Sequence, residues 1–216
     1  MRVRGPRTLW VPTLGLAVGL AACSSAPRMS GMGGRLAAAA TSTTIEIPAL
    51  PRSPEEFVTL RNDLAQKPAG GAAMMVVALI VYAQDAKLGE KLITIAVEQR
   101  WLQADGQGYQ GYSLGRADQQ RIRDQVGVRP YIAYSYVAGT SPEGGYALPA
   151  GPLSIEITEV RDEGDGSTKV FVRSTGADSP RPIRLRPNDK GIWKASEWSS
   201  VLVDVRRPTT KQDDPL

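Results

Sequence analysis

An uncharged segment of 13 residues, Ala72–Gln84, constrains the fold more than any other feature of this sequence. Its side chains are apolar almost all round, so a helix built from them has no polar face for water and has to be buried. A helix that spans a bilayer needs about 20 such residues, and a strand typically has about five or six. We therefore predict a buried central helix over Ala72–Gln84; the alternative is a membrane hairpin or a pore-forming segment.

Further helices are predicted on both sides of this segment. Ser53–Gln66 opens with an N-cap serine, a proline and a glutamate that completes a capping box, and Lys67–Gly71 ends it. Apolar periodicity predicts a third helix over Ala86–Trp101 and a short polar helix over Arg116–Val126. Gln103–Gly115 contains four glycines but no Walker-type ending, which indicates a mobile loop rather than a phosphate-binding loop.

The apolar period changes from 3.6 to 2 after Pro130, which indicates strands. The predicted strands are Tyr131–Val137, Leu153–Val160, Lys169–Arg173, Pro182–Arg186 and Ile192–Ala195, and Trp198 with Val201–Val205 closes the domain. The fold class is therefore α+β: three main helices and a short one in the N-terminal part pack on a C-terminal antiparallel sheet of five or six strands, with the uncharged helix against the sheet.

The sequence of 216 residues contains no histidine. This excludes Ser-His-Asp and Cys-His nucleophiles, imidazole-ligated zinc and the most common general base. Carboxylates, lysine, serine, threonine and tyrosine remain, and they are too common to indicate a reaction. We therefore predict no catalytic residue, no metal site and no cofactor, and we lean towards a function that is not enzymatic.

Two local patterns could carry chemistry, and each has a simpler explanation. Asp162, Glu163 and Asp165 with intervening glycines resemble part of a calcium loop, but the spacing lacks the later bidentate glutamate, so a hairpin turn is favoured. Lys194 and Ser196 could form a Ser-Lys pair, although two residues apart on a strand this is a common coincidence.

The aromatic residues offer a candidate binding surface, because loops and one strand could bring several of them to one rim. Its members are Tyr109, Tyr112, Tyr134, Tyr136, Tyr146, Trp193 and Trp198. Tyr134 and Tyr136 are expected on the same face of their strand. For the two tryptophans, packing of both indoles under the final hairpin is the favoured alternative.

The N-terminus indicates export. Three arginines precede an uncharged run from Val11 to Ala22, too short for a permanent anchor, and the run ends in Leu20-Ala21-Ala22-Cys23. This motif resembles the lipobox of bacterial lipoproteins, which implies cleavage between Ala22 and Cys23 and acylation of Cys23. The alternative is an ordinary secretory peptide cut after Ala22. Ser24 in place of aspartate implies an outer-membrane destination.

This processing determines the predicted domain organisation: signal peptide 1–22, lipidated cysteine and flexible tether 23–47, one α+β domain 48–207, and a disordered tail 208–216. Cleavage removes three arginines and no acid, so the net charge falls from +4 to 26 − 3 − 22 = +1. The basic character of the whole chain is therefore no sign of nucleic-acid binding. The sequence does not indicate an oligomeric state.

Two segments, Lys67–Met75 and Arg184–Ser200, resemble an uncharacterised domain of bacterial lipoproteins and other exported bacterial proteins. The resemblance covers roughly Ser53–Val205 and implies a single exported domain without an assigned activity. We therefore expect a lipid-anchored envelope protein with a binding or scaffolding domain, whose partner is the membrane and an envelope protein or glycan. The alternatives are a histidine-free hydrolase that uses carboxylates or a Ser-Lys pair, and a purely structural surface lipoprotein.

Overall fold

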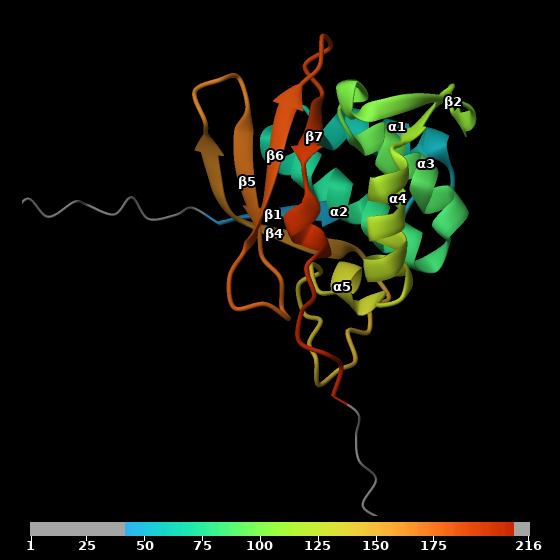
Figure 1. Ribbon diagram of the computed structural model, residues 1–216. Helices are drawn as coiled ribbons and strands as arrows, with labels where there is room; N and C mark the ends of the chain where they lie inside the picture. Colours follow the sequence, from blue (N-terminus) through green and yellow to red (C-terminus); the bar gives the residue numbers. More distant parts are fainter. Residues whose placement is uncertain (1–41, 210–216) are drawn as a thin grey trace, which may run out of the picture. The chain divides into compact units, whose positions relative to one another are not determined.

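The computed structural model describes residues 42–209. Within this range five α-helices accompany a five-stranded antiparallel sheet and a two-stranded sheet, so the predicted α+β class is confirmed (Figure 1). The predicted signal peptide, Cys23 and most of the predicted tether lie outside the described residues, as does the tail from residue 210.

The large sheet has the strand order β1-β4-β5-β6-β7, and every neighbouring pair is antiparallel. Its strands are β1 (Thr43–Ile47), β4 (Leu153–Asp162), β5 (Thr168–Val172), β6 (Arg181–Pro187) and β7 (Trp193–Glu197). Alternate residues of β4 to β6 are buried against the helices, as the period of 2 predicts.

Strand β1 lies in a stretch for which the sequence predicts a tether. Residues 43–47 pair with β4, with Ile45 opposite Ile155 and Ile47 opposite Leu153. Only Ile47 of the strand is fully buried, because β1 is an edge strand that carries two threonines and a glutamate. The folded domain therefore begins at least five residues before the predicted boundary at residue 48.

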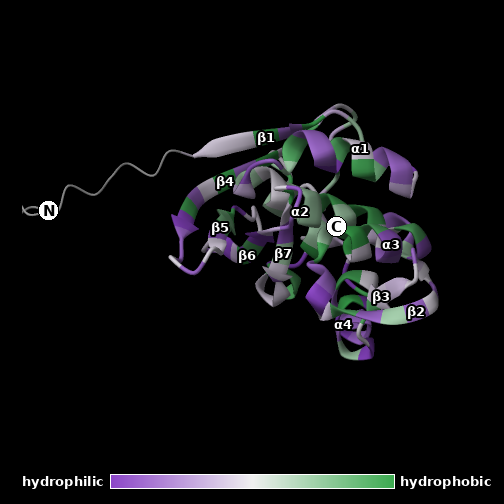
Figure 2. Cartoon of the chain, turned by 90° about the horizontal axis from the view of Figure 1, so that it is seen from above, coloured by the Kyte–Doolittle hydropathy of each residue, from purple (hydrophilic) through white to green (hydrophobic). Residues whose placement is uncertain are grey.

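Helix α2 (Pro68–Gln84) is the centre of the fold, and all its residues from Gly70 to Tyr82 are buried. It lies between the sheet on one side and α1 and α3 on the other (Figure 2). The helix begins four residues earlier than predicted, with Pro68 at its first position. A Cβ on Gly71 would lie 2.7 Å from the Trp193 carbonyl oxygen, so this glycine allows the helix to approach β7 closely.

The structure uses the apolar segment as a buried core helix instead of a membrane element. No helix in residues 42–209 combines the length and the apolar content needed to cross a bilayer.

Helices α1 (Pro54–Leu64) and α3 (Ala86–Ala96) cover the side of α2 that faces away from the sheet. The Ser53 hydroxyl accepts a hydrogen bond from the Glu56 amide at 3.2 Å, which is the predicted N-cap. Helix α3 stops at Ala96, before the predicted end at Trp101, because Val97 leaves the helix to form a parallel bridge with Ala195 of β7.

The predicted mobile loop over Gln103–Gly115 is wrong. This segment forms most of a hairpin, β2 (Leu102–Tyr109) and β3 (Tyr112–Leu114). Gln110 and Gly111 turn the chain with φ angles of 50° and 84°, the left-handed pair that suits a two-residue hairpin turn. The strands carry mostly polar side chains and glycines, so they lack the alternation of apolar residues from which a strand is predicted.

The predicted strand over Tyr131–Val137 is also wrong. Residues 131–134 form the short helix α5, which follows α4 (Arg116–Ile122) and a π-helical turn, Arg123–Gly127. Ile132 packs with Tyr146 and Val205, whereas Tyr136 belongs to the main core, so these two alternating residues are buried in different clusters. Only Val137 makes a bridge to the sheet, with Ile155.

Candidate functional site

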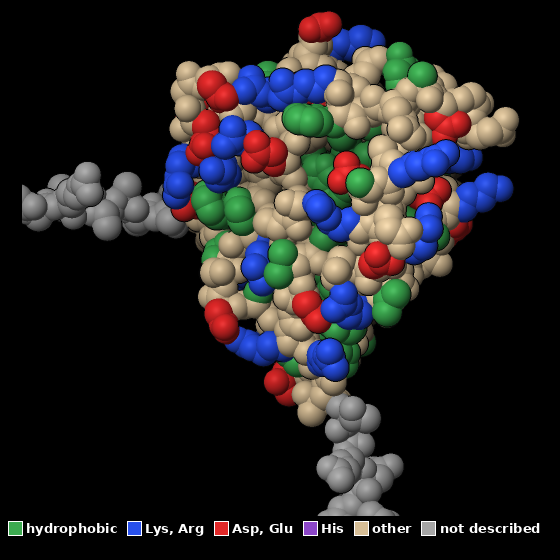
Figure 3. All heavy atoms as spheres, viewed as in Figure 1, with side chains coloured by type: hydrophobic (Ala, Val, Ile, Leu, Met, Phe, Trp, Pro, Cys, Tyr) green, Lys and Arg blue, Asp and Glu red, His purple; other side chains and the backbone are tan. Residues whose placement is uncertain are grey.

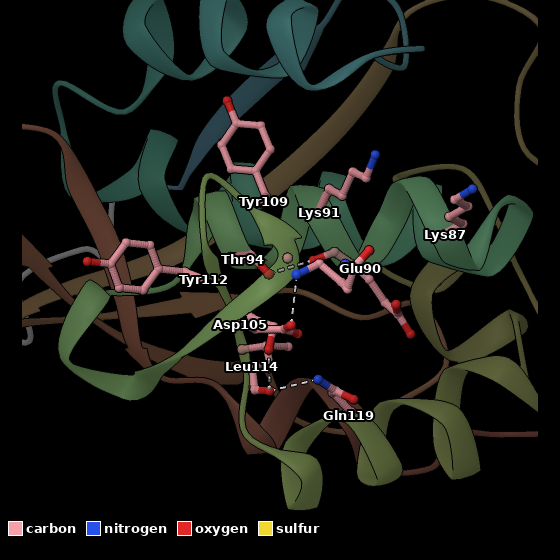
Figure 4. Close-up of a pocket in the computed structure, with 12 residues that line it drawn as sticks. Lys87, Glu90, Lys91, Thr94, Asp105, Tyr109, Tyr112, Leu114 and Gln119 are labelled. Carbon is pink, nitrogen blue, oxygen red and sulfur yellow. Dashed lines mark hydrogen bonds between the residues drawn. The ribbon is translucent and has the colours of Figure 1, made fainter.

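The best candidate site is a cleft between α3 and the β2–β3 hairpin (Figure 4). It consists of two hollows, of about 280 and 360 Å³. Thr94 of α3 and the hairpin residues Tyr109 and Tyr112 line both. The wrongly predicted loop is therefore one wall of the site, and its two tyrosines stand between the hollows.

The smaller one, which we call the mixed hollow, has charges of both signs. Helix α3 contributes Lys87, Glu90 and Lys91, and the hairpin contributes Asp105. The Asp105 carboxylate accepts a hydrogen bond from the Gln107 amide at 3.0 Å, which fixes the hairpin backbone. Figure 4 shows the α3 side chains in a row beside the hairpin. Two lysines and two acids balance one another here.

The larger one, which we call the basic hollow, has charges of one sign. Arg61 comes from α1, Lys190 from the β6–β7 turn and Lys194 from β7, and no aspartate or glutamate is among the residues that line it. The apolar part of its wall consists of Val58, Ile95 and Leu102. The fold therefore brings three basic residues to one hollow, although α1 and the β6–β7 hairpin are far apart in the sequence.

The cations of the basic hollow have no acidic partner in the described part of the chain. Among residues 42–209, no carboxylate lies within 4 Å of Arg61, Lys190 or Lys194. The Arg61 guanidinium donates to the Asn62 side-chain oxygen at 2.8 Å instead. No ion pair within 4 Å in the described residues therefore offsets the repulsion between these like charges.

This environment shifts two of the pKa values. Burial, together with the positive charge of Arg61, lowers the pKa of the Lys194 ammonium from its ordinary value of 10.5 to about 8. Burial also lowers the pKa of Arg61, which stays charged at neutral pH. A bound anion would raise both pKa values, because it stabilises the charged forms.

The candidate tyrosines do not form one rim. Tyr109 and Tyr112 border the cleft, but their rings point in different directions (Figure 4). Tyr136 and Tyr146 are buried, and burial raises the pKa of both phenols. The half-buried Tyr134 belongs to α5, so it does not share a strand face with Tyr136.

The hydroxyls of the two buried tyrosines bond to the chain near its C-terminal end. Tyr136 donates to the Val201 carbonyl at 3.2 Å, and Tyr146 donates to the Arg206 carbonyl at 2.6 Å. These phenols therefore hold the last residues of the domain and are not accessible to a ligand.

The tryptophans lie in different places. Trp193 is half-buried and packs over Gly71, whereas Trp198 is 7% exposed and borders a small hollow of about 140 Å³. The exposed ring in that hollow is Trp101, which the sequence analysis did not select, with the Arg100 guanidinium carbon 5.5 Å from its centroid. The only feature of the sequence that could have singled out Trp101 is that it directly follows Arg100.

The acidic turn after β4 is held by its own backbone and by basic neighbours. The carboxylates of Asp162 and Asp165 accept the amides of Gly164 and Ser167, both at 2.9 Å. Glu163 lies 3.2 Å from the Lys169 ammonium. Residues 42–209 contain no group of three or more acidic or cysteine side chains that could hold a metal ion.

The Ser-Lys pair considered from the sequence is not brought together. The Ser196 hydroxyl donates to the Arg184 carbonyl at 3.2 Å and borders the small hollow, whereas Lys194 borders the basic hollow. The basic hollow itself escaped the sequence analysis, because no local pattern connects Arg61 with Lys190 and Lys194.

Comparison with known proteins adds a family. The sequence model of one family, described as a domain of unknown function (DUF6935), matches residues 49–209. No curated protein and no solved structure matches the chain. The matched range contains both hollows, whose lining residues run from Val58 to Lys194.

Proposed function

The chain belongs to this family of domains of unknown function, and we propose that it is a bacterial envelope lipoprotein whose domain binds a ligand in the α3–hairpin cleft. The lipobox-like Leu20-Ala21-Ala22-Cys23 supports the anchor, with the outer membrane as the proposed destination. The cleft supports binding.

The observation that carries the binding proposal is the charge of the basic hollow. Arg61, Lys190 and Lys194 line it together, with no acid among the lining residues. Like charges in a partly buried site cost folding free energy, and functional sites are where proteins keep such arrangements. Tyr109 and Tyr112 add aromatic surface of the kind that is enriched where proteins bind partners.

The anchor is tested by metabolic labelling with a clickable fatty acid and by membrane fractionation. The wild-type chain should be labelled and sediment with the envelope, because two or more acyl chains give stable attachment. Cys23→Ala should lose the label and appear in the soluble fraction. An unlabelled wild-type chain would contradict the lipoprotein part of the proposal.

The cleft is tested by site-specific photo-crosslinking in intact envelopes. A photo-reactive residue at position 112, where the tyrosine side chain is 37% exposed at the cleft, should give a discrete adduct. The matched control is position 128, where the valine is 72% exposed outside the cleft. Equal adducts at both positions, or none at position 112, would count against the cleft as the binding site.

A further inference from the structure

We propose that the basic hollow is a subsite for an oxyanion, a phosphate-like group that Arg61, Lys190 and Lys194 hold together. This inference rests on the proposed binding function and adds the chemical class of the ligand. It starts from a hollow in which basic side chains from separate elements meet without an aspartate or glutamate among the lining residues.

The position of the three cations supports an anion more than a neutral ligand. The guanidinium of Arg61 offers a planar fork of donors, and the lysine ammonium groups act as point charges around it. The three side chains belong to α1, the β6–β7 turn and β7, and all three line the same hollow. An oxyanion with three or more acceptor oxygens can use donors from several directions at once.

The burial of Lys194 is the second argument. A lysine on a flexible stem normally keeps its ammonium in water, but Lys194 is half-buried in a hollow that Arg61 also lines. The Lys194 side chain could turn towards solvent and so reduce its repulsion with Arg61, unless neighbouring residues hold it in place. β7 fixes its backbone by pairing with β6 through Arg186 opposite Lys194. A bound anion would offset the repulsion between Lys194 and Arg61.

The walls of the hollow indicate what carries the oxyanion. Val58, Ile95 and Leu102 are apolar, and Tyr109 adds an aromatic side chain to the lining. A volume of about 360 Å³ is in the range of small-molecule sites and exceeds the need of a bare phosphate. The geometry therefore fits a phosphate-like group attached to a compact ring-bearing group.

The test is isothermal titration calorimetry of the full chain in detergent with inorganic phosphate, in a chloride buffer of constant ionic strength. The wild-type chain should bind phosphate, and Lys194→Gln and Arg61→Gln should each weaken binding at least tenfold. Lys67→Gln is the matched control, because Lys67 is exposed and lines neither hollow, and it should change affinity less than twofold. No binding by the wild-type chain, or an equal loss in the control, would overturn the subsite.

Lys190→Gln keeps the test valid if a more buried substitution impairs folding. Lys190 is exposed in the turn between β6 and β7, so its replacement leaves the core intact. It should weaken phosphate binding at least threefold with an unchanged thermal midpoint. Unchanged affinity in this folded variant would contradict a role for the turn.

The oxyanion could belong to a soluble metabolite or to a lipid headgroup. A second experiment distinguishes these two ligands. The Cys23→Ala chain, which lacks the proposed anchor, is mixed with vesicles of phosphatidylcholine alone or with added phosphatidylglycerol. Binding to the anionic vesicles that Lys194→Gln abolishes would assign the headgroup. Phosphate binding without vesicle binding would assign a soluble ligand.

The two proposals fail separately. An adduct at position 112 without phosphate binding would leave the cleft as a binding site and overturn only the oxyanion. Absence of both would overturn the binding function as well.

Discussion

The domain carries two clusters of basic side chains that differ in one respect, the presence of acidic partners. On the face of the sheet opposite α2, Arg173 lies 2.8 Å from Glu156, and Glu163 is shared by Lys169 and Arg184 at 3.2 and 3.3 Å. Figure 3 shows basic and acidic side chains against one another over β5 and β6. In the basic hollow, none of the three cations has such a partner among the described residues.

The difference separates two uses of charge. Paired charges on the open face of a sheet keep that face soluble and contribute little each, because water screens them. Unpaired like charges in a cleft lower stability, and a bound anion removes the repulsion. We therefore attribute the sheet cluster to the fold and propose that the basic hollow serves binding.

Charge reversal in each cluster is the strongest test of whether only the basic hollow binds an anion. Lys194→Glu should weaken phosphate binding about 100-fold or more, a change of about 2.7 kcal/mol, because it places a negative charge in the subsite. Arg173→Glu, an exposed reversal on the sheet, should leave affinity within twofold. Calorimetry of both variants compares them directly, and equal losses would show that only overall charge matters.

The pH dependence of stability gives the next largest effect. The pKa of Lys194 is about 8 in the folded protein and near 10.5 when unfolded, so between these values the unfolded chain binds more protons and stability rises with pH. From pH 7.5 to 9.5 the free energy of unfolding should rise by about 1–2 kcal/mol. Urea denaturation measures it, and Lys194→Met should abolish the rise.

The window ends near pH 9.5 because the tyrosines act in the opposite direction. Burial raises the pKa of Tyr136 and Tyr146, so above about pH 10 the unfolded chain loses protons first and stability falls. A wild-type stability that stays flat or falls from pH 7.5 to 9.5 would contradict an uncompensated Lys194.

Removal of an acid from the sheet tests the other half of the comparison. Glu163→Gln leaves Lys169 and Arg184 without their shared carboxylate and should lower the free energy of unfolding by about 0.5–1 kcal/mol. Phosphate affinity should not change. A stability gain would mean that the sheet cluster resembles the basic hollow after all.

The smallest effect is stabilisation by the ligand itself. At a phosphate concentration equal to Kd, binding adds RT ln 2, about 0.4 kcal/mol, or about 1 °C in the thermal midpoint. Lys194→Gln should show no difference between phosphate and chloride at equal ionic strength. An equal shift in wild type and variant would indicate a general salt effect.

The elements with strong local signals could be predicted from the sequence. The uncharged run predicted the central helix, because a helix without a polar face has to be buried. Ser53 and Pro54 predicted the start of α1. The alternating residues of β4 to β6 gave the sheet. In each of these cases local preference and tertiary environment agree.

The errors occur where tertiary contacts decide. Tyr131–Val137 alternates like a strand, yet its start is the short helix α5, in which Ile132 packs with Tyr146 and Val205. The β2–β3 hairpin has no apolar alternation, and β1 is an edge strand whose only partner, β4, begins more than 100 residues later. Propensity alone cannot specify such pairings.

The candidate site was even less accessible to sequence analysis. Tyr109 and Tyr112 were selected, but as part of a rim with Tyr136 and Tyr146, which the structure buries in the core. The basic hollow depends on Arg61 meeting a hairpin about 130 residues away, and each of these basic residues taken singly resembles ordinary surface charge.

The most direct test of the central claim is the pKa of Lys194, measured by NMR from the ¹³Cε shift of the full chain in detergent. Without phosphate the pKa should lie near 8, and with saturating phosphate it should rise by one unit or more, because the bound anion favours the ammonium form. Chloride at the same ionic strength should leave it unchanged. A pKa that phosphate does not move would contradict the assignment of the basic hollow as an oxyanion subsite.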